Sequence, residues 1–167
     1  MLRAAALGEL YLALPTAVSP EEIRRARTVI SESASELKGR GTEFGEPRGV
    51  GAVIDTPAAA LNAERLAAES DFFVADTDRL LTFTLGADRG DACLSELIKR
   101  NPDPVIKLIG YSSKMLHASG KGKLMGVAGD LAADLSLTEG FVSLGADFLS
   151  VPPPYVLEVR EKIRECP

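Results

Sequence analysis

Charged side chains follow two successive apolar segments in the middle of the chain. Residues 50–54 form an apolar run that ends at Asp55, and residues 71–75 form another that ends in Asp76-Thr77-Asp78-Arg79. Carboxylates are ligands for hard cations such as magnesium, and a guanidinium group binds phosphate or carboxylate through paired hydrogen bonds. The pattern therefore indicates a site for a metal ion, for an oxyanion, or for both.

These charged groups lie where predicted strands give way to predicted helices. Thr56 and Pro57 supply an N-cap and a proline at the first helical position, so a helix is expected over residues 58–69. In parallel α/β folds the carboxyl ends of the strands meet at one edge, where ligands bind. Any single aspartate there could instead cap the next helix, and this structural role stays open. The ionisable groups at both strand ends, with Asp88-Arg89 further on, favour a functional site.

Apolar runs and helical patterns alternate along the chain. Strands are expected at residues 10–14, 50–54, 71–75, 124–128 and 147–151. Helices are expected over residues 20–38, 58–69, 91–99, 103–118, 136–144 and 155–165. The first helix should begin with a capping box, Ser19-Pro20-Glu21-Glu22. Strands that alternate with helices predict parallel pairing, so the expected fold class is α/β, built from βα units.

Composition restricts the classes of protein that this chain can belong to. With 167 residues, of which 46% are hydrophobic, residues 1–167 are expected to form a single domain with a substantial core. A net charge of -5 without a long basic run argues against a nucleic-acid partner. One histidine, His117, and two distant cysteines, Cys93 and Cys166, give neither a zinc-site spacing nor a disulfide framework.

The N-terminal segment is only mildly apolar. Residues 2–18 include Arg3, Glu9 and Pro15, and the segment is too short to span a bilayer. Glu9 also falls where a signal peptide would need its apolar core. We therefore expect a cytoplasmic protein without a membrane partner.

The residues around both strand ends resemble a known family. Val53-Ile54-Asp55-Thr56-Pro57-Ala58-Ala59-Ala60 is similar to the V-E-x-P-A-A-A segment of the phosphoenolpyruvate-binding domain of enzyme I of the bacterial phosphotransferase system. The chain from Asp71 to Arg89 resembles the D-F-F-S-I-G-T-N-D-L-T-Q-Y-x-L-x-x-D-R segment of that family. Gly129-Asp130, with Ala132 and Asp134, resembles its M-C-G-E-x-A-x-D segment. The similarity extends over nearly the whole chain from about Leu10.

The resemblance implies a fold and partners. Domains of this family are eight-stranded βα barrels, and this chain corresponds to about the last five units, which implies a partial TIM-type barrel. Five parallel strands would leave two unpaired edges, at residues 10–14 and 147–151, and an uncovered apolar face. Self-association, a partner chain, or collapse to an open sheet could each cover them. Of these we expect a homo-oligomer.

The resemblance also implies roles for individual residues. Asp55 and Arg79 occupy the family's two magnesium-ligand positions, but arginine cannot ligate a metal ion. Asp78 stands where an asparagine contacts phosphate, and Arg89 matches the phosphate-binding arginine. Ala128 replaces the cysteine that acts as general acid. The implied site is therefore Asp78, Arg79 and Arg89 for a phosphate or substrate, with Asp55 as the remaining ligand for a magnesium cofactor.

Three functional hypotheses follow from these residues. In the first, the chain is a catalytically impaired relative that binds a small anion such as phosphoenolpyruvate or serves in assembly. In the second, it is an enzyme, either a phosphotransferase subunit completed by another chain or a lyase-like activity on a keto acid, with Asp78 rescuing the metal site. In the third, it is a truncated gene product without an evolved role.

Overall fold

The computed structural model describes residues 1–87 and 101–167, so Arg89, Cys93 and the helix expected over 91–99 lie outside the described residues. The described strands form one parallel sheet in the chain order β1-β2-β3-β4-β5. Their bounds are Tyr11–Leu14 (β1), Gly49–Ile54 (β2), Phe72–Asp76 (β3), Leu124–Ala128 (β4) and Phe148–Ser150 (β5). The predicted α/β class and the parallel pairing are confirmed.

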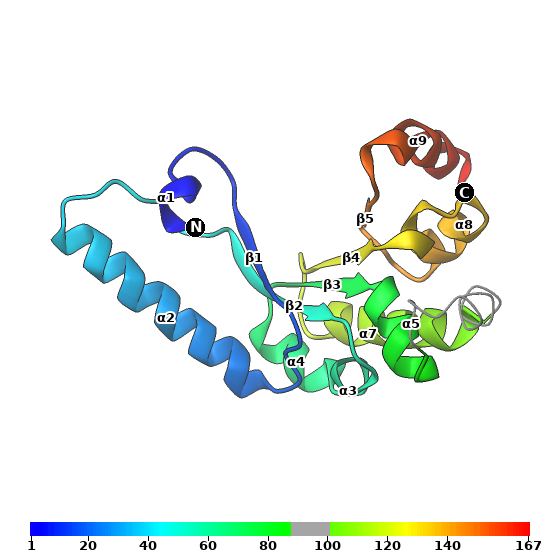
Figure 1. Cartoon of the computed structure of the whole chain (residues 1–167), viewed down its shortest axis with the longest axis horizontal. Helices are drawn as coiled ribbons and strands as arrows, with labels where there is room; N and C mark the ends of the chain where they lie inside the picture. The colour runs from blue at the N-terminus through cyan, green and yellow to red at the C-terminus, as the bar shows by residue number, and fades with distance from the viewer. Residues whose placement is uncertain (88–100) are drawn as a thin grey trace.

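Helices connect these strands, as the alternation predicted. They are α1 (Leu2–Ala5), α2 (Pro20–Gly39), α3 (Pro57–Leu61), α4 (Ala63–Glu69), α5 (Thr77–Leu85), α7 (Asp103–Ala118), α8 (Leu135–Ser143) and α9 (Val156–Glu165). Two short 3-10 turns cover Asp130–Ala133 and Pro153–Tyr155. Figure 1 shows α3, α4, α5 and α7 gathered on one side of the sheet. None of the helices within the described residues is long and apolar enough to cross a membrane.

The helix expected over residues 58–69 is interrupted, which corrects the prediction. Asn62 leaves helical geometry at φ −91° and ψ 10°, between α3 and α4. Its side-chain amide donates a hydrogen bond of 2.9 Å to the carbonyl of Val18. Leu61 at the end of α3 is 67% exposed, while Leu66 of α4 is fully buried. The break at Asn62 thus leaves Leu61 in solvent and allows the Asn62 side chain to hydrogen-bond the loop after β1.

Side chains alternate between the two faces of the sheet, and one face carries the main core. The strand residues in that core are Val50, Ala52, Ile54, Phe73, Ala75, Met125 and Val127. They pack against Leu66 of α4, Leu80 of α5 and Ile109 of α7, among others. These strand residues are buried because α4, α5 and α7 cover that side of β3 and β4.

The other side, here called the open face, includes Tyr11, Gly51, Phe72, Gly126 and Phe148. Its aromatic rings come from the odd strands β1, β3 and β5, and its glycines come from β2 and β4. A Cβ on Gly51 would meet the Phe72 ring at 2.7 Å, and one on Gly126 would meet the Phe148 ring at 2.1 Å. Tyr11 is 47% exposed and Phe148 39% exposed, so this face is only partly covered. Side chains from alternate strands that share a layer are typical of βα barrel interiors.

Candidate functional site

Four strand ends meet at the carboxyl edge of the sheet, as the parallel pairing requires. Thr16 follows β1, Asp55 follows β2, Asp76 ends β3 and Ala128 ends β4. Register pairing places Asp76 beside Ala128. The sequence-predicted residues Asp55, Asp78 and Arg79 therefore lie at one edge, while Arg89 falls outside the described residues.

Asp55 is the buried centre of this edge. Its side chain is fully buried, and Oδ2 accepts hydrogen bonds from the Thr16 amide at 3.0 Å and from the Thr16 hydroxyl at 3.3 Å. Nη1 of Arg79 forms an ion pair with the same oxygen at 2.9 Å. Within the described part of the chain, Asp55 Oδ1 has no hydrogen-bond partner. The two residues that the resemblance assigns to metal ligands thus contact one another directly.

The start of α5 fixes the position of Arg79. Asp76 is the N-cap of this helix, and its Oδ1 accepts the backbone N–H groups of Asp78 and Arg79 at 3.1 Å each. Nη2 of Arg79 donates to the Thr16 hydroxyl at 3.2 Å. The guanidinium carbon lies 5.9 Å from the ring centroid of Phe83, a cation–π arrangement one turn further along. The guanidinium group is therefore held on three sides.

Asp78 points away from this ion pair, toward β4. Its Oδ1 accepts the backbone N–H of Asp130 at 3.0 Å. Gly129 allows this close approach, because a Cβ there would lie 2.4 Å from the Thr77 hydroxyl and 3.0 Å from Asp78 Cγ. Asp78 therefore joins the ends of β3 and β4, and Arg79 joins the ends of β1, β2 and β3.

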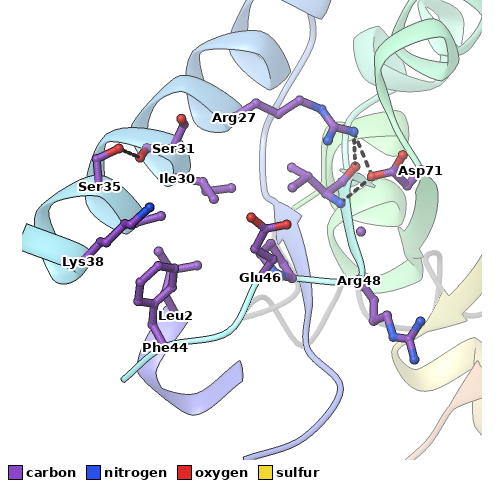
Figure 2. A pocket seen from close by; sticks show the side chains of 14 residues that line it. Leu2, Arg27, Ile30, Ser31, Ser35, Lys38, Phe44, Glu46, Arg48 and Asp71 are labelled. Carbon is purple, nitrogen blue, oxygen red and sulfur yellow. Dashed lines mark hydrogen bonds and ion pairs between the residues drawn. The ribbon is translucent and has the colours of Figure 1, made fainter. Parts of the chain in front are cut away.

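A separate cavity of about 490 Å³ lies at the opposite, amino edge of the sheet (Figure 2). Figure 2 shows Arg27 of α2 reaching Asp71, to which it donates a hydrogen bond of 2.8 Å. Arg27 also donates to the carbonyl of Glu69 at 3.0 Å. Arg48, also at the rim of the cavity, is paired with Glu9 at 2.7 Å. The residues predicted from the sequence lie instead at the carboxyl edge, which is therefore the candidate site.

Known proteins are similar to this chain over nearly its whole length. The sequence pattern of the family described as "PEP-utilising enzyme, PEP-binding domain" matches residues 1–167. The chain belongs to the PEP-utilising enzyme family. It is 37% identical over 164 residues to the phosphoenolpyruvate-protein phosphotransferase of Haemophilus influenzae and covers 28% of that protein. It is 31% identical over 165 residues to the phosphoenolpyruvate-protein phosphotransferase of Streptococcus equinus and covers 28% of that protein.

Solved structures of low identity support the fold of this PEP-utilising family member. A pyruvate kinase from Pyrobaculum aerophilum superposes with a TM-score of 0.59 at 19% identity, covering 99% of this chain and 38% of that one. A pyruvate kinase from Cryptosporidium parvum gives a TM-score of 0.62 at 13% identity, covering 92% of this chain and 31% of that one. The five parallel strands with their helices are consistent with a partial (βα) barrel. The chain spans less than a third of the length of the phosphotransferases that it matches.

The residues at this edge of the PEP-utilising family member do not fit magnesium as they are arranged. Magnesium needs near-octahedral oxygen ligands at about 2.0–2.1 Å. Asp55 Oδ2 is already occupied by Thr16 and by the cationic Arg79, which leaves only Oδ1. Within residues 1–87 and 101–167, no group of three His, Cys, Asp or Glu side chains could hold a metal ion.

Sequence reasoning missed two residues of this site in the PEP-utilising family member. Thr16 contacts both Asp55 and Arg79, and Phe83 lies beneath the guanidinium. The strand-end argument applied to residues 10–14 would have found Thr16. Phe83 falls on the tyrosine position of the family segment quoted above, so the resemblance could have indicated it.

Proposed function

We propose that this chain is a catalytically impaired member of the PEP-utilising enzyme family that binds a small oxyanion at the carboxyl edge of its sheet. The observation that carries the proposal is the Asp55–Arg79 ion pair at the two positions that the resemblance assigns to metal ligands. Phosphoryl transfer depends on positioning and on charge stabilisation, which metal ions commonly supply. Alanine at position 128 has no proton to donate where the resemblance implies a general acid.

Arg79 is the group proposed to bind the anion. A guanidinium group has five N–H donors, and Asp55 and Thr16 engage only some of them. The Arg79 side chain is 43% exposed, so its remaining donors can reach solvent. A planar set of donors matches a carboxylate or phosphate. The expected ligand class is a three-carbon acid such as phosphoenolpyruvate.

Isothermal titration calorimetry tests the binding. Phosphoenolpyruvate and pyruvate are titrated into the chain with and without magnesium, and Arg79→Gln is expected to weaken binding at least tenfold. Arg65→Gln, on the exposed side of α4, is the control and should leave affinity unchanged. Absence of binding under both conditions would remove the ligand-binding role, and turnover of phosphoenolpyruvate by the chain alone would refute the impairment.

A second candidate is a phosphotransferase-like subunit that another chain completes. It is favoured by the match of 98% of this chain to only 28% of the H. influenzae phosphotransferase. The exposed open face would then contact the completing chain. The test adds this chain to an H. influenzae phosphotransferase from which the matching segment has been removed. Phosphoenolpyruvate consumption that appears only in the mixture would support this candidate over the first.

A further inference from the structure

We infer that the Arg79 guanidinium is a tethered cation that excludes a divalent metal ion from Asp55 and makes oxyanion binding at this edge independent of metal. The oxyanion part rests on the function proposed above. The exclusion of metal does not, because it can be measured without any organic ligand. The two ideas can therefore fail separately.

The first step concerns the charge on Asp55. A fully buried carboxylate is costly unless a cation or hydrogen bonds compensate it. Among the described residues, Arg79 is the cation that pairs with Asp55, and the Thr16 amide and hydroxyl add two hydrogen bonds to the same oxygen. The requirement for positive charge at this buried carboxylate is thus met from within the chain.

The second step concerns how firmly the guanidinium is held. The backbone N–H of Arg79 donates to the Asp76 cap, and Nη2 of its side chain donates to the Thr16 hydroxyl. The Phe83 ring lies against the guanidinium group. A planar guanidinium can bridge Asp55 and Thr16 at once, and the Phe83 ring lies on a further side, 5.9 Å from the guanidinium carbon. The cation is therefore part of the folded structure and is not a long side chain that moves freely.

The third step concerns competition with a metal ion. Arg79 Nη1 lies 2.9 Å from Asp55 Oδ2, where a ligated magnesium would have to replace it. An ion bound to Oδ1 instead would sit beside the guanidinium charge and be repelled. Protein ligands for the rest of its coordination shell are absent from the described part of the chain. Binding of a divalent ion therefore requires displacement of Arg79.

The experiment measures melting temperature with Mn²⁺ and Mg²⁺ for the whole chain and three variants. The wild type and Arg79→Lys, which keeps a cation, should show no shift. Arg79→Asp replaces the cation with a carboxylate beside Asp55, and its melting temperature should rise by about 3 °C or more at metal concentrations tenfold above the dissociation constant. Adding Asp55→Asn to Arg79→Asp should abolish that rise, and circular dichroism confirms that each variant is folded.

Two metal results would overturn the inference. One is a metal-induced rise in the wild type that Asp55→Asn removes, since metal and Arg79 would then coexist. The other is a folded Arg79→Asp variant without any response to metal, since Arg79 would then not be what keeps metal away.

A calorimetric comparison needs only the wild type and so remains decisive if Arg79→Asp does not fold. Phosphoenolpyruvate should bind with the same affinity, within twofold, in EDTA and in magnesium. A requirement for magnesium overturns the inference. Complete lack of binding overturns the metal-independent oxyanion site together with the proposed function, while the melting results still decide the exclusion of metal.

Discussion

Thr16 makes hydrogen bonds at the candidate site while its own backbone is held in a strained conformation. Its φ of 57° is the one positive value among the described non-glycine residues. A β-branched residue in this region is strained by about 1–3 kcal/mol. In return its amide and hydroxyl both contact Asp55, and the hydroxyl also accepts from Arg79. Strain of this kind commonly accumulates at functional sites.

Gly129 provides a prediction at the residue scale. Its φ of 100° and the close approach of Thr77 leave no room for a side chain. Gly129→Ala should therefore lower the free energy of unfolding by about 2 kcal/mol or more, measured by urea denaturation. Gly140→Ala is the control, because this glycine lies in α8 and a Cβ added to it would meet nothing within 4 Å. That control should be neutral or stabilise by up to about 1 kcal/mol, and an equal loss in both would contradict the argument.

At the scale of elements, β3 and β5 begin in the same way. Asp71 precedes β3, and its carboxylate accepts the Val50 amide at 2.8 Å and pairs with Arg27. Asp147 precedes β5, and its carboxylate accepts the Met125 amide at 2.7 Å and pairs with His117 at 3.2 Å. Asp71 therefore connects β2 to α2, and Asp147 connects β4 to α7. The same contact, here called the aspartate clamp, thus occurs twice, once at Asp71 and once at Asp147.

Loss of this clamp should destabilise the sheet. Asp147→Ala leaves the amide of the fully buried Met125 without its carboxylate acceptor, so the free energy of unfolding should fall by about 1–3 kcal/mol. Asp71→Ala should have a similar effect through Val50. Glu161→Ala, on the exposed side of α9, should change stability by less than about 0.5 kcal/mol in the same urea titration. Equal stability of all three variants would refute a role for the clamp.

The capping box of α2 gives a prediction about pH. Glu22 accepts the backbone N–H groups of Val18 at 2.8 Å and Ser19 at 2.9 Å. These hydrogen bonds hold the pKa of Glu22 below its ordinary value of 4.5. The fold therefore favours the ionised form, and this contribution is complete above about pH 4.5 and is lost as pH falls through the lower folded pKa.

Glu22→Ala should consequently lower the free energy of unfolding by about 1 kcal/mol at neutral pH. The difference from wild type should shrink as the pH falls below about 4. Thermal denaturation across this pH range provides the measurement. Glu32→Ala, an exposed position on the same helix, should show no such dependence. A pH-independent difference for Glu22→Ala would mean that the ionised carboxylate is not the capping group.

At the scale of the whole molecule, the open face and the two edge strands expose apolar side chains to solvent. Tyr11 and Phe148 lie on the outermost strands of the described sheet and are both more than a third exposed. Helix α2 also extends well beyond the sheet in Figure 1, and its Val29 is 52% exposed. Exposed apolar side chains on unpaired edge strands can be covered by association with another chain. We therefore propose that the chain self-associates.

Sedimentation velocity over a range of concentrations tests this proposal. The wild type should form a dimer, and Phe148→Ser should reduce the association constant at least tenfold, which corresponds to about 1.4 kcal/mol. Leu61→Ser is the matched control, because Leu61 is 67% exposed on α3 but lies away from the open face. A wild type that stays monomeric at every concentration would exclude a homodimer.

The sequence by itself determined the order and class of the elements. Apolar runs and caps such as Ser19-Pro20 and Thr56-Pro57 depend on neighbouring residues alone, so they can be recognised locally. Parallel pairing is then sufficient to predict that Asp55, Asp78 and Arg79 lie at one edge of the sheet. Arg89 belongs to the same prediction but lies outside the described residues.

Only the tertiary structure decided which of these groups contact one another. Because α5 begins at Thr77, the consecutive residues Asp78 and Arg79 project about 100° apart around the helix. Arg79 therefore reaches Asp55, and Asp78 reaches the amide of Asp130. Such pairings depend on helix phase, on strand register and on the strained turn at Thr16, which are set by contacts between residues far apart in the chain. A pattern of neighbouring residues does not predict those contacts.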